Sequence, residues 1–132
     1  MPRYKSALSR GRPVLEIELT DATTGDLLPR LLLADTGAGD AWSGFELILH
    51  EDDCQRSSGI PSHTAALGGA YSGIYPVYSV RVQIPAIGFD DFVSAVGLPD
   101  WDEDFDGIAC FRFLNRFTYG NFGDASGFGL EL

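Results

Sequence analysis

Residues 31–42 read LLLADTGAGDAW, and the character of this stretch changes halfway along. The first four residues are apolar and predict a buried strand. An acid, a small hydroxyl residue and a glycine follow, as Asp35-Thr36-Gly37. Ala38 and Gly39 come next, and small residues of this kind allow a tight turn with close backbone approach. We therefore expect a buried strand to hold the carboxyl group of Asp35 rigid at its end.

The segments around this stretch predict a mostly-β chain. Residues 14–20 (VLEIELT) alternate apolar and polar side chains, and the turn residues DATTGD follow. Residues 14–34 therefore predict a β-hairpin that ends at Asp35. The other predicted elements are strands at residues 45–49 and 89–98, a long hairpin with a glycine-rich tip at 63–84, and a final hairpin at 118–132. Residues 50–62 predict a polar loop, residues 99–107 an acidic loop, and residues 108–117 permit a strand followed by one short helix.

The composition fits one domain, residues 1–132, with residues 1–12 as a flexible N-terminal arm. Hydrophobic residues make up 45% of the chain, which is enough for a core without disulfides or metals. A formal net charge of −10 argues against nucleic acid as a partner, because phosphate contacts need a basic face. No segment approaches the roughly 18 apolar residues of a membrane span, and the N-terminus lacks a signal-peptide pattern. We expect a cytoplasmic protein with no membrane partner, whose Cys54 and Cys110 are reduced thiols.

Three motifs, taken in order, resemble those of the retropepsin-like (retroviral-type) aspartic proteases, in a bacterial-type single-domain form. The first is LLLADTGA at residues 31–38, and the second is the glycine-bearing hairpin. The third is DFDGIACFRFLNRF at residues 104–117, an apolar strand that runs toward a short helix. The resemblance covers the chain from about Val14 to Leu132. It implies a retropepsin-like closed β-barrel with a flap hairpin, one short C-terminal helix, no cofactor and no metal.

The chemistry of this family explains how a single Asp-Thr-Gly can suffice. Peptide hydrolysis by an activated water needs a base for the water and an acid for the carbonyl oxygen. Two carboxyl groups held about 3 Å apart share one proton and fill both roles. A chain with one such acid must borrow the second from a copy of itself across a two-fold axis. The resemblance therefore implies a homodimer in which Asp35 of each copy is catalytic, Thr36 hydrogen-bonds across the axis, and Gly37 permits the turn.

The resemblance also implies a site for an extended peptide or protein substrate. The hairpin from Ala65 to Tyr75 would close over the peptide as a flap and exclude water. Substrate contacts are expected from Ala38 and Gly39 of the turn and from Gly68, Gly69 and Tyr71 of the flap. Tyr71 is the expected contact at the flap tip. The function that the resemblance predicts is an aspartic endopeptidase.

Two residues of the third motif depart from the family pattern. Cys110 stands where the family usually has a glycine that lets this strand lie against the catalytic loop. Arg112 stands where the family usually has aspartate or asparagine. These departures favour an alternative function, a catalytically weak or inactive dimeric peptide-binding module of the same fold. Taken alone, Asp-Thr-Gly is also typical of an ordinary turn.

A third hypothesis is a calcium-binding β-domain. Residues 102–107 (DEDFDG) match the first half of an EF-hand loop, with Asp102, Asp104 and Asp106 as ligands. Phe113 stands at the twelfth position, where the bidentate glutamate should be, so a solvated acidic loop is the simpler interpretation. His50 and His63 have no ligand partners at useful spacing and predict surface or interface histidines.

Overall fold

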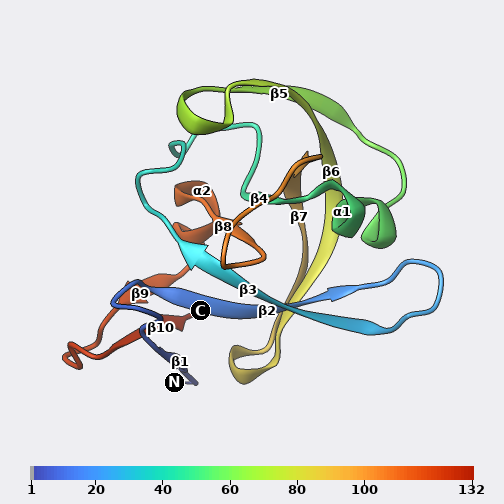
Figure 1. Ribbon diagram of the computed structural model, residues 1–132. Coiled ribbons are helices and arrows are strands. Elements are labelled where there is room, and N and C mark those ends of the chain that lie inside the picture. Colours follow the sequence, from blue (N-terminus) through green and yellow to red (C-terminus); the bar gives the residue numbers. More distant parts are fainter. Residues whose placement is uncertain (1) are drawn as a thin grey trace.

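Six strands of the chain close into a β-barrel (Figure 1). The computed structural model describes residues 2–132 and is mostly β, with 48% strand and 13% helix. Around the ring the strands follow in the order β2 (Val14–Thr20), β3 (Leu27–Ala34), β8 (Gly107–Ala109), β4 (Leu47–His50), β7 (Phe89–Leu98) and β6 (Gly73–Ile84). A short antiparallel pairing of β6 with β2, with Val82 opposite Leu19, completes the ring. The mostly-β closed barrel predicted from the sequence is confirmed.

The core of the barrel follows the alternation of side chains along its strands. On β2 the apolar positions Leu15, Ile17 and Leu19 are fully buried, while Glu16 between them is exposed. The matching buried positions of β6 are Tyr78, Val80, Val82 and Ile84. Full burial of one large apolar side chain stabilises the fold by roughly 1.5–3 kcal/mol. The period-2 pattern thus decides which face of each strand lines the barrel.

The two hairpins predicted at residues 14–34 and 63–84 are confirmed. Strands β2 and β3 pair antiparallel from Val14 opposite Leu33 to Thr20 opposite Leu27. Strand β5 (His63–Leu67) pairs antiparallel with the first part of β6. Figure 1 shows this second hairpin arching over one end of the barrel. The fold therefore holds one hairpin in the barrel wall and projects part of the other beyond it.

Both ends of the chain belong to a second, three-stranded sheet. Strand β10 (Gly127–Glu131) lies between β1 (Tyr4–Ala7) and β9 (Thr118–Gly120), and both pairings are antiparallel. The pairing of β9 with β10 confirms the predicted final hairpin. The N-terminal segment differs from the prediction of a flexible arm, because residues 4–7 form β1 on the edge of this sheet. An ion pair of 2.9 Å between Arg3 and Glu131 adds to this attachment.

The helical segments are short. They are α1 (Glu51–Ser57), the 3₁₀ turns η1 (Gly69–Tyr71) and η2 (Pro85–Ile87), and α2 (Phe111–Leu114). Among residues 2–132, no helix has both the length and the apolar character needed to cross a membrane. The single turn of α2 buries Phe113, whose ring makes edge contacts with Phe89 and Phe117.

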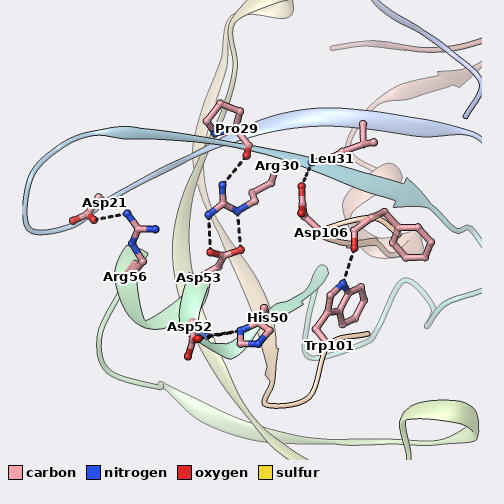
Figure 2. A network of polar contacts seen from close by, with 11 residues as sticks. Asp21, Pro29, Arg30, Leu31, His50, Asp52, Asp53, Arg56, Trp101 and Asp106 are labelled. Atoms are coloured by element: carbon pink, nitrogen blue, oxygen red, sulfur yellow. Dashed lines mark hydrogen bonds and ion pairs between the residues drawn. The ribbon is translucent and has the colours of Figure 1, made fainter. Parts of the chain in front are cut away.

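Helix α1 corrects the prediction of a polar loop at residues 50–62. His50 caps it, because His50 Nδ1 accepts a hydrogen bond of 3.0 Å from the backbone N–H of Asp52. The Arg30 guanidinium donates two hydrogen bonds of 2.8 Å to the two carboxylate oxygens of Asp53 and ties the helix to β3 (Figure 2). Cys54 is the one apolar side chain that the helix buries, so its sequence carries no apolar periodicity to reveal it.

Candidate functional site

Asp35 lies at the end of β3, beside the strand that carries the third motif. Strands β3 and β8 pair in parallel, with Ala34 opposite Ala109. The Asp35 N–H donates a hydrogen bond of 3.0 Å to the Ala109 carbonyl, and the Phe111 N–H donates one of 3.0 Å to the Ala38 carbonyl. Two motifs that are far apart in the sequence are therefore joined along their backbones at this point.

The turn after β3 depends on its glycines. The Gly37 N–H donates a hydrogen bond of 2.9 Å to Asp35 Oδ1, and a Cβ at Gly37 would lie 3.3 Å from the same oxygen. Gly39 has a φ of +72°, and a Cβ there would lie 2.7 Å from Ser43 Oγ. Asp35 is half-buried, whereas Thr36 and Gly37 are exposed. The turn thus fixes one carboxylate oxygen and leaves its outer face open.

A cavity of about 500 Å³ opens beside Asp35. The turn and the barrel strands line one side, and the tip of the β5–β6 hairpin lines the other. Its lining residues are Asp35, Gly37, Ala38, Gly39, Ser43, Phe45, Ile48, Ala66, Leu67, Gly68, Ala70, Tyr71 and Ile108. Of the site residues predicted from the sequence, only Thr36 and Gly69 do not line the cavity. The structure therefore brings the predicted turn and the predicted hairpin tip to one place.

The lining of this cavity is chemically simple. Of the residues that line it, Asp35 alone carries a carboxyl group. Most of the others are apolar or glycine, and Ile48 and Ile108 are buried side chains of the barrel wall. A single chain therefore offers one carboxylate at the edge of an apolar hollow.

Tyr71 connects the hairpin tip to the loop between β7 and β8. Its ring stacks on Trp101, with the ring centres 5.9 Å apart and the planes 14° from parallel. Its hydroxyl donates a hydrogen bond of 3.0 Å to Glu103 Oε1. Burial raises the pKa of Tyr71 above its ordinary value, and the hydrogen bond and negative charge of Glu103, with a smaller contribution from the charge of Asp35, add to the shift. Tyr71 therefore stays a neutral hydrogen-bond donor at neutral pH.

Cys110 is accommodated without separating the two motifs. It is fully buried among Leu33, Phe45 and Ile108, and its N–H donates a hydrogen bond of 3.0 Å to the Glu46 carbonyl. Burial raises the pKa of this thiol to about 12, and the charge of Asp35 adds to the shift. The thiol is therefore neutral and acts as a small apolar side chain.

The second departure, Arg112, has a clear structural role. Its Nη1 donates a hydrogen bond of 2.8 Å to the carbonyl of Ser43, a residue that lines the cavity.

The close approach of strands β8 and β4 depends on Gly107 and not on a glycine at position 110. A Cβ at Gly107 would lie 2.5 Å from the Ile48 carbonyl oxygen. The glycine that permits close packing thus stands at the start of β8.

No protein-family model, curated protein or solved structure matches this chain.

Several cavity residues were not predicted from the sequence. Ser43, Phe45, Ile48, Ala66, Leu67, Ala70 and Ile108 fall in this group. Phe45 and Ile48 lie in the strand predicted at residues 45–49, and its nearly continuous apolar residues are a signal for burial on both faces. Trp101 and Glu103 lie in the acidic loop predicted at residues 99–107, and only their contacts with Tyr71 reveal their position near the site.

The side chains of the acidic loop at residues 99–107 are not grouped as calcium ligands. Asp106 Oδ2 accepts a hydrogen bond of 2.9 Å from the Leu31 N–H, and Asp104 forms an ion pair of 2.7 Å with Arg10. Within residues 2–132, no group of three His, Cys, Asp or Glu side chains is arranged to hold a metal ion. His63 is exposed, as predicted for a surface histidine, and its Nε2 lies 3.1 Å from the Gly44 carbonyl oxygen.

Proposed function

We propose that this protein is a homodimeric aspartic endopeptidase of the retropepsin-like type. The observation that carries the proposal is the position of Asp35, at the rigid end of β3, on the edge of an apolar cavity that a hairpin tip covers. Such an arrangement suits an acid that acts on a bound peptide away from bulk water. No cofactor takes part in the proposed reaction.

A second copy of the chain supplies the second acid. The cavity contains the carboxyl group of Asp35 and no other, whereas the reaction needs one acid and one base. Thr36 and Gly37 are exposed on the outer face of the turn, where an identical turn can approach across a two-fold axis. Thr36 does not line the cavity, which supports a role in joining the two turns and not in binding substrate.

The reaction follows from the shared proton of the two Asp35 carboxyl groups. The ionised carboxylate takes a proton from water, and the water oxygen forms a bond to the carbonyl carbon of the peptide. The protonated carboxyl group donates its proton to the carbonyl oxygen and gives a neutral tetrahedral intermediate. The Asp35 that took the proton from water then donates it to the peptide nitrogen, and the C–N bond of the intermediate breaks. The other Asp35, now ionised, takes a proton from a hydroxyl group of the intermediate. The products are a carboxylic acid and an amine.

The substrate in this proposal is an extended peptide segment. The cavity lies between the turn and the hairpin tip, and a hairpin offers backbone groups to an extended chain. Apolar lining from Phe45, Ile48 and Leu67 favours an apolar side chain next to the bond that is cleaved.

The test is incubation of the wild type and of Asp35→Asn with a mixture of peptides between about pH 4 and pH 7. Cleavage products are read by mass spectrometry. We expect products from the wild type and none from Asp35→Asn, because the amide keeps the shape of the side chain but cannot exchange the proton. Asp40→Asn is the matched control, since it makes the same change in charge on the same loop and should retain cleavage.

The second candidate function is a dimeric peptide-binding module that does not cleave. The observation in its favour is the pair of departures in the third motif, Cys110 and Arg112. The same experiment separates the two functions. A verified wild-type dimer that cleaves nothing across this pH range favours the binding module, and cleavage that survives in Asp35→Asn rules out the proposed role of Asp35.

A further inference from the structure

The tip of the β5–β6 hairpin is held by another segment of the same chain. Tyr71, at the end of η1, meets the loop of residues 99–106 through two different contacts. Its ring stacks on Trp101 and its hydroxyl donates to Glu103 Oε1 at 3.0 Å. One contact is apolar and the other is polar, so together they fix both the plane and the direction of the Tyr71 side chain.

The loop of residues 99–106 is itself firmly attached to β3, the strand that leads into Asp35. Trp101 Nε1 donates a hydrogen bond of 2.6 Å to the Phe105 carbonyl, and Phe105 is buried. The Asp106 N–H donates to the Leu31 carbonyl at 2.7 Å, and the Leu31 N–H donates back to Asp106 Oδ2 at 2.9 Å. Leu31 belongs to β3. The contacts therefore form a continuous chain from the strand that positions Asp35 to the hairpin tip.

The hairpin tip has few contacts around its two adjacent glycines. A Cβ added at Gly68 or at Gly69 would meet no atom within 4 Å, so the Cβ position of each glycine faces open space. Gly69 has a φ of +64°, and no side chain caps η1. A glycine-rich tip of this kind gains order from tertiary contacts and not from its own backbone. Tyr71 is therefore the residue that joins the tip to the loop of residues 99–106, while Leu67 and Tyr75 pack against the barrel.

We propose that Trp101 and Glu103 are positioning residues that act through Tyr71 and hold the hairpin over the cavity beside Asp35. The contacts of Tyr71 with Trp101 and Glu103 are called the clasp below. The clasp is made within one chain, so each copy closes its own hairpin. Entry of a peptide requires the Tyr71 contacts to open, and their return holds the hairpin on the bound peptide. The role in peptide binding rests on the proposed function, whereas the clasp itself can be tested without any catalytic activity.

The test is amide hydrogen exchange in the full chain, read by mass spectrometry over the hairpin segment of residues 65–75. In Glu103→Ala the Tyr71 hydroxyl loses its acceptor, and we expect exchange in this segment to become about fivefold faster. Asp102→Ala is the matched control, because it removes a neighbouring acid from the same loop. Exchange in β2 and β3 should be unchanged in both variants.

Two further variants separate positioning from general stability. Trp101→Ala should accelerate exchange in residues 65–75 at least as much as Glu103→Ala, and Trp101→Phe should restore much of the protection because a ring remains for Tyr71 to stack on.

A fluorescence measurement reports on the same contact. The chain has two tryptophans, and Trp42→Phe removes one of them and leaves Trp101 as the only source of tryptophan emission. In that background Tyr71→Ala should shift the emission of Trp101 to longer wavelength, since the ring that covers it is gone.

The outcomes distinguish the clasp from the proposed function. Hairpin exchange that does not change in Glu103→Ala and Trp101→Ala overturns the clasp, whether or not the wild type cleaves peptides. Faster exchange in both variants supports the clasp, even if the wild type cleaves nothing and the protease proposal fails. Faster exchange throughout β2 and β3 as well would mean general loosening of the barrel, and would also overturn the clasp.

Discussion

The backbone N–H of Asp35 donates a hydrogen bond of 3.0 Å to the carbonyl of Ala109. Asp35 directly follows β3 and Ala109 ends the adjacent parallel strand β8, although most of the barrel separates the two residues along the chain. This bond places the turn after β3 directly against the turn that begins α2. The stiffness of the Asp35 position therefore comes from the whole barrel, because β8 also pairs with β4 on its other side.

Gly107→Ala should destabilise the protein by about 3 kcal/mol. A Cβ at this position would lie 2.5 Å from the Ile48 carbonyl oxygen, and backbone atoms cannot move aside cheaply. Urea unfolding followed by circular dichroism measures the loss. Gly68→Ala is the matched control and should change the free energy of unfolding by less than about 0.5 kcal/mol, since open space surrounds Gly68. An equal effect of the two substitutions would contradict the close approach of β8 and β4.

The two thiols should resist alkylation in the folded protein. Cys54 and Cys110 are fully buried, and burial raises the pKa of each thiol to about 12 from an ordinary value of 9.0. The thiolate is the reactive form, so its fraction in the folded state is small at mildly alkaline pH. Labelling should therefore need unfolding, and the labelled mass should appear only in denaturant. Rapid labelling of Cys110 in the native state would contradict its burial.

The same thiols predict alkaline destabilisation. Between about pH 9 and pH 12 they lose their protons in the unfolded state but keep them when folded, so the free energy of unfolding should fall as the pH rises. Cys54→Ala should make this fall less steep. A stability that is flat across that range would mean that the thiols are exposed. Unfolding in urea at several pH values provides the measurement.

Tyr71 should respond to the charge of Glu103. Burial is the largest cause of its raised pKa, and the hydrogen bond and charge of Glu103 come next. Glu103→Gln should therefore lower the pKa of Tyr71 part of the way toward its ordinary value and not beyond it. Ultraviolet absorbance detects the tyrosinate, and Tyr71→Phe identifies which part of the titration belongs to Tyr71. Asp102→Asn, which removes one charge from the same loop, should have a smaller effect.

The elements that local pattern determines could be predicted from the sequence. Alternation at Leu15, Ile17 and Leu19 predicted β2, and the turn residues after it predicted the hairpin with β3. The glycine-rich centre of residues 63–84 predicted a hairpin tip, because glycine is favourable in turns and weakens strands. Most of the site residues that the family resemblance implied lie along one cavity.

The remaining features depend on contacts between distant segments. Helix α1 has Cys54 as its one buried apolar residue, and its attachment to β3 comes from Arg30 and Asp53, which lie in separate elements. Strand β1 exists because β10 is beside it, and its own sequence carries no strong alternation. Trp101 and Glu103 lie in an acidic loop whose composition predicts solvation, and no local rule predicts that Tyr71 meets them.

The most direct measurement of the central claim is the activity of mixed dimers. Wild-type protein is mixed with an increasing excess of Asp35→Asn under conditions that allow subunits to exchange, and peptide cleavage per wild-type chain is followed by mass spectrometry. Because a mixed dimer would hold only one Asp35 carboxyl group, we predict that this activity falls toward zero as the variant accumulates, and that an equal excess of Asp40→Asn does not lower it. Cleavage per wild-type chain that stays constant in a large excess of Asp35→Asn would contradict a catalytic pair built from two copies of Asp35.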